Sequence, residues 1–84
     1  MSTTTSSIQY NIEVSSSQPD TGADYGVQIS VQQTSSFGDT EAVALYNAQL
    51  AAVPTGFSAP ISSLSKLTQS MTQANWSASA QAFQ

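Results

Sequence analysis

Two segments near the start of the chain, residues 8–14 and 25–32, alternate apolar and polar residues without exception. Strict alternation is typical of strands that bury one face. We therefore predict strands at residues 8–14 and 25–33. The buried faces would carry Ile8, Tyr10, Ile12, Val14, Tyr25, Val27, Ile29 and Val31. The polar residues between them would face outward.

The segment between these strands, residues 15–24, is rich in Ser, Pro, Asp and Gly. Asp20 and Asp24 flank Gly22, which distantly resembles a calcium loop. A calcium site needs about six to eight oxygen ligands at a defined spacing, and this segment does not supply them. Gly22 permits a positive φ and Asp20 favours a bend, so we interpret the segment as a turn.

The next segment has the helical period. Its apolar residues Val43, Tyr46, Leu50 and Val53 recur at spacings of three, four and three. Such spacing places them on one face of a helix. Asp39 or Thr40 can cap the first backbone N–H groups, and Pro54 cannot continue the helix. We predict a helix over residues 40–53.

The last third of the chain also shows near-helical spacing. Its apolar positions are Ile61, Leu64, Leu67, Met71, Ala74 and Ala78. We predict a second helix over residues 60–80. Because Ser and Thr compete with the backbone for hydrogen bonds, this helix would depend on packing for its stability.

Together these elements predict one small α+β domain over residues 8–84, in the order β-β-α-α, after a polar N-terminal arm at residues 1–7. An antiparallel strand pair would pack on one or two helices. A two-stranded sheet is only marginally stable, and neither predicted strand contains the Lys, Arg or Pro that often guards a sheet edge. We therefore expect the sheet to extend between subunits. Whether the strands pair within the chain or with neighbouring subunits stays open.

The low charge content changes the picture of the surface. Asp, Glu, Lys and Arg make up 7% of the 84 residues, whereas about 25% is ordinary for a globular protein. The net charge is −4, and Lys66 is the only basic residue. A single cation provides no basic patch for nucleic acid or for acidic lipid. We expect protein partners, either further copies of the chain or a larger protein assembly, with no nucleic acid and no membrane.

The first seven residues are polar and lack the basic and apolar regions of a signal peptide. No segment approaches the roughly 20 apolar residues that span a bilayer. We expect synthesis in the cytoplasm without a signal peptide, and incorporation into a virion is compatible with that.

The residue types exclude much of the familiar catalytic chemistry. The chain has no His and no Cys, so nucleophile–base pairs with histidine and structural zinc sites are excluded. Ser62 and Ser70 would lie one turn from Lys66 on the second predicted helix. Serine is so frequent here that chance explains this neighbourhood. We expect no enzyme, and we assign no catalytic residue, cofactor or metal.

Two features of the last segment favour an interface. Ser70, Ala74, Ala78 and Ala82 repeat every four residues. On a helix they would form a strip of small side chains that another helix can approach closely. Trp76 lies outside this strip and Phe83 follows it, and Trp is enriched at interface hot spots. Trp76 would contact either a partner or the strands of its own chain. The predicted interface residues are Ser70, Ala74, Trp76, Ala78, Ala82 and Phe83.

No motif matches a family signature. In being short, nearly uncharged, free of cysteine and rich in Ser, Thr, Gln and Ala, the chain resembles small structural proteins of virions, tails and protein filaments. We predict a non-enzymatic structural protein that acts through repeated self-contacts, such as a capsid, decoration or tail component. The alternative is a small soluble adaptor or inhibitor of one larger protein, for example a phage protein directed at a host defence enzyme. It would present Trp76 or the loop at residues 15–24.

Overall fold

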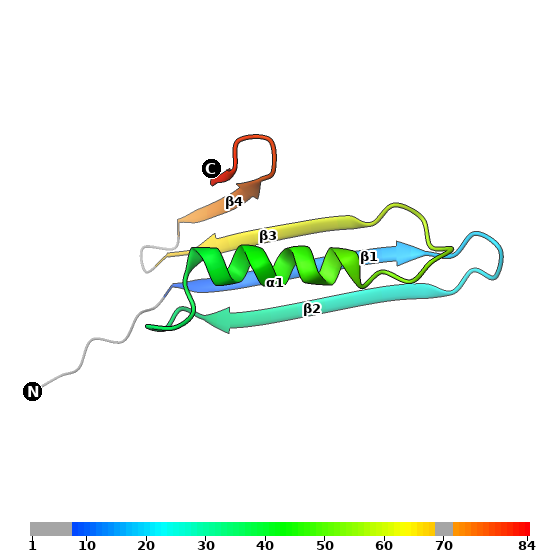
Figure 1. Ribbon diagram of the computed structural model, residues 1–84, viewed down its shortest axis with the longest axis horizontal. Helices are drawn as coiled ribbons and strands as arrows, with labels where there is room; N and C mark the ends of the chain where they lie inside the picture. The colour runs from blue at the N-terminus through cyan, green and yellow to red at the C-terminus, as the bar shows by residue number, and fades with distance from the viewer. Residues whose placement is uncertain (1–7, 69–71) are drawn as a thin grey trace, which may run out of the picture.

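The computed structural model describes residues 8–68 and 72–84, so the predicted arm at residues 1–7 lies outside the described part. Within the described residues, five strands form one antiparallel sheet in the order β2-β1-β3-β4-β5, and a single helix lies on one face of it (Figure 1). The elements are β1 (Gln9–Ser17), β2 (Asp24–Gln32), α1 (Asp39–Ala51), β3 (Ile61–Leu67), β4 (Gln73–Ser77) and β5 (Ala82–Phe83).

The first two strands were predicted from their alternation, and they pair with each other inside the chain. Their register sets Ile12 opposite Ile29 and Val14 opposite Val27, so the apolar residues of both strands share one face. β1 extends to Ser17, three residues further than predicted, and β2 lies one residue earlier than predicted, so residues 18–23 form the connection. Gly22 has a φ of 73° there, which confirms the turn interpretation.

The first helix is also confirmed, although it begins one residue earlier and ends two residues earlier than predicted. Gly38 is the N-cap, and its backbone N–H donates to Oε1 of Glu41 at 2.8 Å. The predicted side-chain cap from Asp39 or Thr40 is wrong, because the N-cap is Gly38, which has no side chain. In the described residues, no helix is long and apolar enough to cross a bilayer.

The position of α1 follows from the connections. Both β2 and β3 run antiparallel to β1, so they are parallel to each other and need a crossover, which α1 provides. Because β1 lies between them, the helix passes over the middle of the sheet and packs on β1 and β3 (Figure 1). The edge strand β2 receives little cover from it.

The core lies between α1 and the central strand. The fully buried apolar side chains are Tyr10, Ile12 and Val14 of β1, Leu64 of β3 and Ala42 of α1. β1 is the most buried strand because it has a neighbour on each side and the helix above it. The apolar residues of β2 stay half-buried, since the sheet ends there.

The predicted β-β-α-α fold is wrong. The described part of the protein is mostly antiparallel sheet with one short helix, and the segment predicted as a second helix over residues 60–80 contains β3 and β4. The helical spacing of Ile61, Leu64 and Leu67 was misleading, because β3 sends alternate residues to opposite faces. Leu64 is 1% exposed, whereas Ile61 is 80% exposed.

β3 also changes the expected edges. It pairs with β1 along seven residues, so one of the two strand edges that looked unguarded in the sequence is covered by the chain itself. β2 keeps the other edge at one end of the sheet.

This alternation in β3 generates a stability test. Replacing Leu64 by Ala should lower the free energy of unfolding by about 2–5 kcal/mol, because a buried side chain is removed from the core. Replacing Ile61 by Ala should change it by less than about 0.5 kcal/mol, as is usual for an exposed side chain. Denaturant unfolding of both variants provides the measurement. Equal losses would contradict the strand, since a helix would bury both positions.

Candidate functional site

One face of the sheet points away from α1, and we call it the outer face. α1, the one helix in residues 8–68 and 72–84, covers the opposite face. Alternation along the strands places on the outer face Gln9, Asn11, Glu13, Ser15, Ser17, Asp24, Gly26, Gln28, Ser30, Gln32, Ile61, Ser63, Ser65, Leu67, Gln73, Asn75 and Ser77. Most of these side chains are polar and uncharged.

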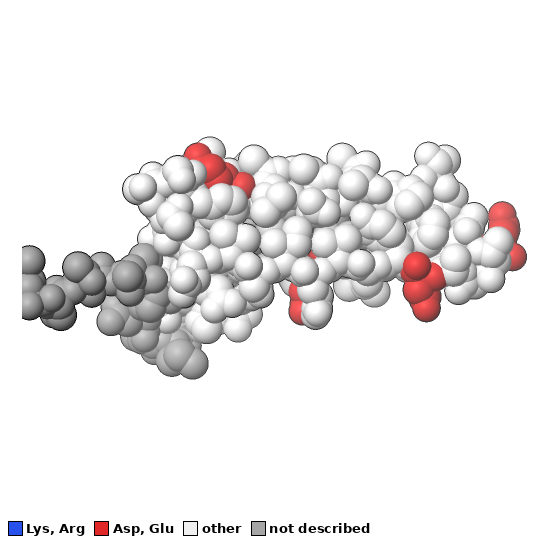
Figure 2. Space-filling view, turned by 90° about the horizontal axis from the view of Figure 1, so that it is seen from below, with Lys and Arg blue, Asp and Glu red and all other residues white. Residues whose placement is uncertain are grey.

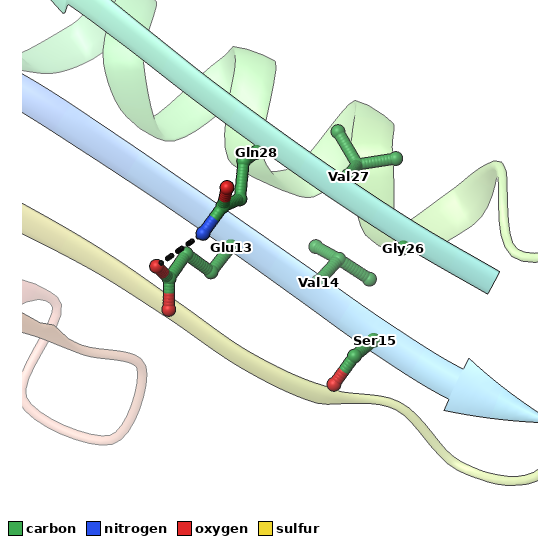
Figure 3. A pocket seen from close by; sticks show the side chains of 6 residues that line it. All are labelled: Glu13, Val14, Ser15, Gly26, Val27 and Gln28. Atoms are coloured by element: carbon green, nitrogen blue, oxygen red, sulfur yellow. Dashed lines mark hydrogen bonds between the residues drawn. The ribbon is translucent and has the colours of Figure 1, made fainter. Parts of the chain in front are cut away.

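Hydrogen bonds between side chains order the outer face. The hydroxyl group of Ser30 donates to Oδ1 of Asn11 at 2.7 Å, across β2 and β1. Two residues further along the same two strands, Nε2 of Gln28 donates to Oε1 of Glu13 at 3.0 Å (Figure 3). Pairs of this kind stabilise neighbouring strands by roughly 0.2–1 kcal/mol each. The outer face is therefore a polar surface whose donors and acceptors are partly matched to one another.

A shallow hollow of about 350 Å³ interrupts this face beside Gly26. Its lining residues are Glu13, Val14, Ser15, Gly26, Val27 and Gln28 (Figure 3). A Cβ atom at Gly26 would meet no atom within 4 Å, so the missing side chain leaves open space over the strand. Glu13 supplies the only charge in this hollow, and Gln28 already binds its carboxylate.

The free edge of β2 is the second surface of interest. In an antiparallel pair, successive residues of a strand turn their backbone N–H and C=O groups alternately toward the partner and away from it. The N–H of Gln33 donates to the C=O of Ile8 at 2.9 Å. The backbone N–H and C=O groups of the odd-numbered residues of β2 therefore point toward β1. The backbone groups of Gly26, Gln28 and Ser30 therefore point away from the sheet.

The lower edge of the molecule in Figure 1, where β2 lies, faces the viewer in Figure 2. Figure 2 shows scattered acidic residues, separated by uncharged surface, and no Lys or Arg among the described residues that are visible on this side. The free edge of the sheet thus has neither the lysines nor the prolines that commonly protect edges.

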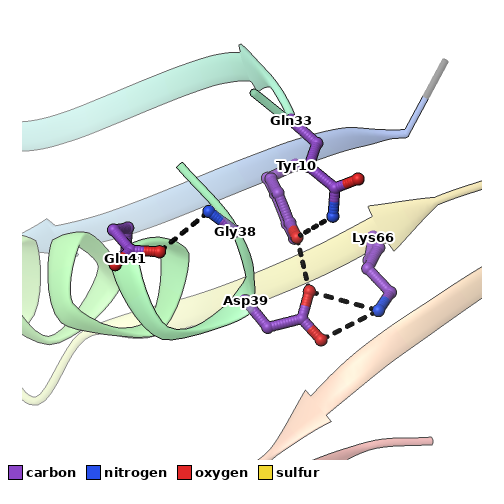
Figure 4. A network of polar contacts seen from close by, with 6 residues as sticks. All are labelled: Tyr10, Gln33, Gly38, Asp39, Glu41 and Lys66. Carbon is purple, nitrogen blue, oxygen red and sulfur yellow. Dashed lines mark hydrogen bonds and ion pairs between the residues drawn. The ribbon is translucent and has the colours of Figure 1, made fainter. Parts of the chain in front are cut away.

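A third group of residues surrounds the N-terminal end of α1. Nζ of Lys66 lies 2.9 Å from Oδ2 and 3.2 Å from Oδ1 of Asp39. The hydroxyl group of Tyr10 also donates to Oδ1 of Asp39, and Nε2 of Gln33 donates to the same hydroxyl group at 3.0 Å (Figure 4). This polar network connects β1, β3 and α1. It binds the only cation of the chain internally.

The network shifts two pKa values. Burial raises the pKa of Tyr10 to about 12, and its hydrogen bond to Asp39 acts in the same direction. Burial acts to raise the pKa of Asp39 as well, but the hydrogen bonds from Tyr10 and Lys66 and the charge of Lys66 outweigh it. The pKa of Asp39 therefore lies below its ordinary value of 3.8. Both shifts favour a neutral phenol beside an ionised carboxylate.

An aromatic hollow of about 510 Å³ lies next to this network. Its lining residues are Asp39, Thr40, Val43, Lys66, Trp76, Gln81, Ala82 and Phe83. The rings of Trp76 and Phe83 meet edge to face, with centroids 5.4 Å apart, and Nζ of Lys66 lies 5.0 Å from the centroid of Phe83. Trp76 is half-buried against the core of its own chain.

The structure brings three of the predicted interface residues together, because Trp76, Ala82 and Phe83 line the aromatic hollow, but it breaks up the predicted strip. The strip of small side chains was predicted on a helix, and no helix exists at these positions: Ala74 lies in β4, Ala78 in the turn after it and Ala82 in β5. Ser70 lies outside the described residues. Trp76 and Phe83 are brought together, and their role at an interface stays a prediction.

The predicted neighbourhood of Ser62 and Lys66 does not form. Four residues along a strand correspond to about 13 Å, so these two side chains of β3 are far apart. The hydroxyl groups of Ser62 and Tyr46 lie 2.7 Å apart, while Lys66 is held by Asp39. Each side chain stabilises the packing of α1 on the sheet.

The polar network predicts how stability depends on pH. Folding favours the ionised form of Asp39, so its contribution is present above pH 3.8 and is lost as the pH falls through the lower pKa of the folded state. Folding favours neutral Tyr10, so that contribution is complete below pH 10 and is lost as the pH rises toward 12.

Unfolding by denaturant across this pH range should therefore show two separable losses. The Asp39→Asn variant should weaken the loss in acid, and the Tyr10→Phe variant should weaken the loss in alkali. Variants whose pH profiles match that of the unaltered protein would show that the network does not link protonation to folding.

Neither hollow assembles a recognisable reaction centre. In the described residues, no group of three acidic side chains is placed to hold a metal ion. The outer face and the free edge of β2 are features that sequence patterns of β1 and β2 indicated, whereas the aromatic hollow required β4 and β5.

Comparisons with protein families, with curated proteins and with solved structures found no match for this chain.

Proposed function

We propose that this chain is a non-enzymatic structural protein that acts through repeated contacts between its own copies. The observation that carries the proposal is the sheet: within residues 8–68 and 72–84, nothing covers one of its faces and no strand pairs with the outer edge of the nine-residue strand β2. Both surfaces present hydrogen-bonding groups with little charge. A surface of this kind suits burial against another protein.

Low charge matters because burial must remove water from every group at an interface. Desolvation of an ion costs far more than desolvation of a hydroxyl or amide group that finds a hydrogen-bond partner. On the outer face Glu13 and Asp24 are the ionised side chains, and the remaining polar groups are Ser, Gln and Asn. Most of the outer face can thus be covered without burying a charge.

The composition makes a component of a virion, such as a capsid, decoration or tail protein, the most suitable instance of this role. Such assemblies bring many copies of a short chain into contact, which compensates for the small core of each copy. The buried core of this chain consists of only five side chains among its described residues.

The aromatic hollow favours a second candidate function. As a small adaptor or inhibitor, this chain would accept an apolar side chain of one larger protein between Trp76 and Val43, beside the paired charges of Lys66 and Asp39. Trp and Arg anchors in partly formed pockets dominate many interfaces. The adaptor would be a monomer or dimer in solution.

Light scattering tests the proposed self-association. Purified protein at high micromolar concentration should form oligomers, and moderate salt should change their proportion little, because the contacts are neutral. A steep decrease in association between low and moderate salt would contradict neutral contacts. A stable monomer that joins no larger particle would contradict the proposed function itself.

Replacing Trp76 by Ala separates the two candidates. In the proposed role, self-association should persist in a variant that still folds, because Trp76 lies away from β2 and faces α1. For an adaptor, the same change should weaken a stoichiometric complex by about 1–2 kcal/mol or more. Circular dichroism of the variant provides the control for folding, and pull-down provides the measurement of the complex.

A further inference from the structure

The free edge of β2 lacks the residues that normally prevent a sheet edge from pairing with another strand. It is nine residues long, contains no Pro, Lys or Arg, and carries one charged residue, Asp24, at its very start. Long exposed edges are usually protected by such residues, because unpaired N–H and C=O groups accept a further strand. In β2 these groups belong to Gly26, Gln28, Ser30 and the two terminal residues.

The side of β2 that faces α1 strengthens this conclusion. Tyr25, Val27, Ile29 and Val31 point toward the helix layer but stay half-buried. The reason is the crossover, which places α1 over β1 and β3. A neighbouring molecule at this edge would cover both the backbone groups and this apolar row.

We infer that the occupant of this edge is β2 of a second copy of the chain. The two strands would pair antiparallel about a two-fold axis that passes midway between the two copies of Gln28. The inference rests on the proposed function and specifies its first contact. The two sheets would merge into one, with both helices on the same side, because this axis is perpendicular to the sheet.

The residue pattern of β2 selects this register. Hydrogen-bonded pairs across the new contact must join residues whose backbone groups face outward, which are the even-numbered ones. An axis at Gln28 pairs all nine residues, and every other register leaves some unpaired. It sets Gln28 opposite itself, Gly26 opposite Ser30 and Asp24 opposite Gln32, so that like charges do not meet.

The same register completes the apolar row. Val27 of one copy lies opposite Ile29 of the other, and Tyr25 lies opposite Val31, all on the side of the helices. Aromatic and β-branched residues are favourable cross-strand neighbours. Four half-buried side chains in each copy would thereby extend the core across the contact.

Single cysteines test the register, because the chain has no cysteine of its own. Residues in a hydrogen-bonded antiparallel pair have Cα atoms about 5.5 Å apart, within the range of about 4.4–6.8 Å that a disulfide allows. Gln28→Cys should therefore form a covalent dimer with itself under mild oxidation. Two copies of Ser30→Cys would be separated by four residues, or about 13 Å along the strand, and should not.

A mixture provides the matched control. Ser30→Cys and Gly26→Cys should each stay monomeric in a non-reducing gel, and the two mixed should form a covalent heterodimer. Gly26 accepts a Cβ atom without a clash. Rapid crosslinking of Ser30→Cys with itself would overturn the register. Failure of Gln28→Cys to crosslink, in protein that scattering shows to be oligomeric, would overturn the β2 contact and leave the proposed function standing.

Proline provides a second test that needs no oxidation. Ser30→Pro removes a backbone N–H that points to the free edge. The hydrogen bonds from β2 to β1 are kept, because they come from the odd-numbered residues of β2. We expect at least a tenfold weaker dimer, measured by analytical ultracentrifugation, with a circular dichroism spectrum like that of the unaltered protein. Ser30→Thr, which keeps the N–H, should dimerise normally. Equal dimerisation of the Pro and Thr variants would overturn the contact, and a monomeric unaltered protein would overturn both proposals.

Discussion

The burial of one face of one sheet by one helix is the interaction on which the structure depends. Tyr10, Ile12 and Val14 of the central strand meet Ala42 of α1 and Leu64 of β3, and these are the fully buried side chains of the described chain. A chain of 84 residues with 39% hydrophobic residues has enough apolar side chains for one such core between a sheet and a helix. The opposite face must therefore be polar, and strands away from the helix must stay partly covered.

Periodicity predicted the first half of the fold because each residue there agrees with its element. In β1 and β2 every inward position except Ser16 is apolar, and α1 begins after Gly38 and ends before Pro54. β3 breaks this agreement. Two of its inward positions are Ser62 and Lys66, which bind α1 through hydrogen bonds, while apolar Ile61 lies outside. The sequence pattern therefore favoured a helix that the tertiary contacts do not allow.

The candidate surfaces were predictable to the same extent. The outward positions of β1 and β2 follow from alternation, and so does the lack of protection along their edges. The polar network could not be predicted, because Tyr10 and Asp39 are 29 residues apart and their contact depends on how α1 crosses the sheet. The meeting of Trp76 and Phe83 likewise depends on a hairpin whose strands have five and two residues.

The short side chains of the outer face have one further consequence for binding. Long side chains such as Lys, Glu and Gln lose about 1.5–2 kcal/mol of rotamer entropy when a partner immobilises them. Serine has one short torsion to lose, and it occupies positions 15, 17, 30, 63, 65 and 77 of this face. The Gln and Asn side chains at positions 9, 11, 28, 73 and 75 are already held by hydrogen bonds. The outer face is thus conformationally restricted before any partner arrives.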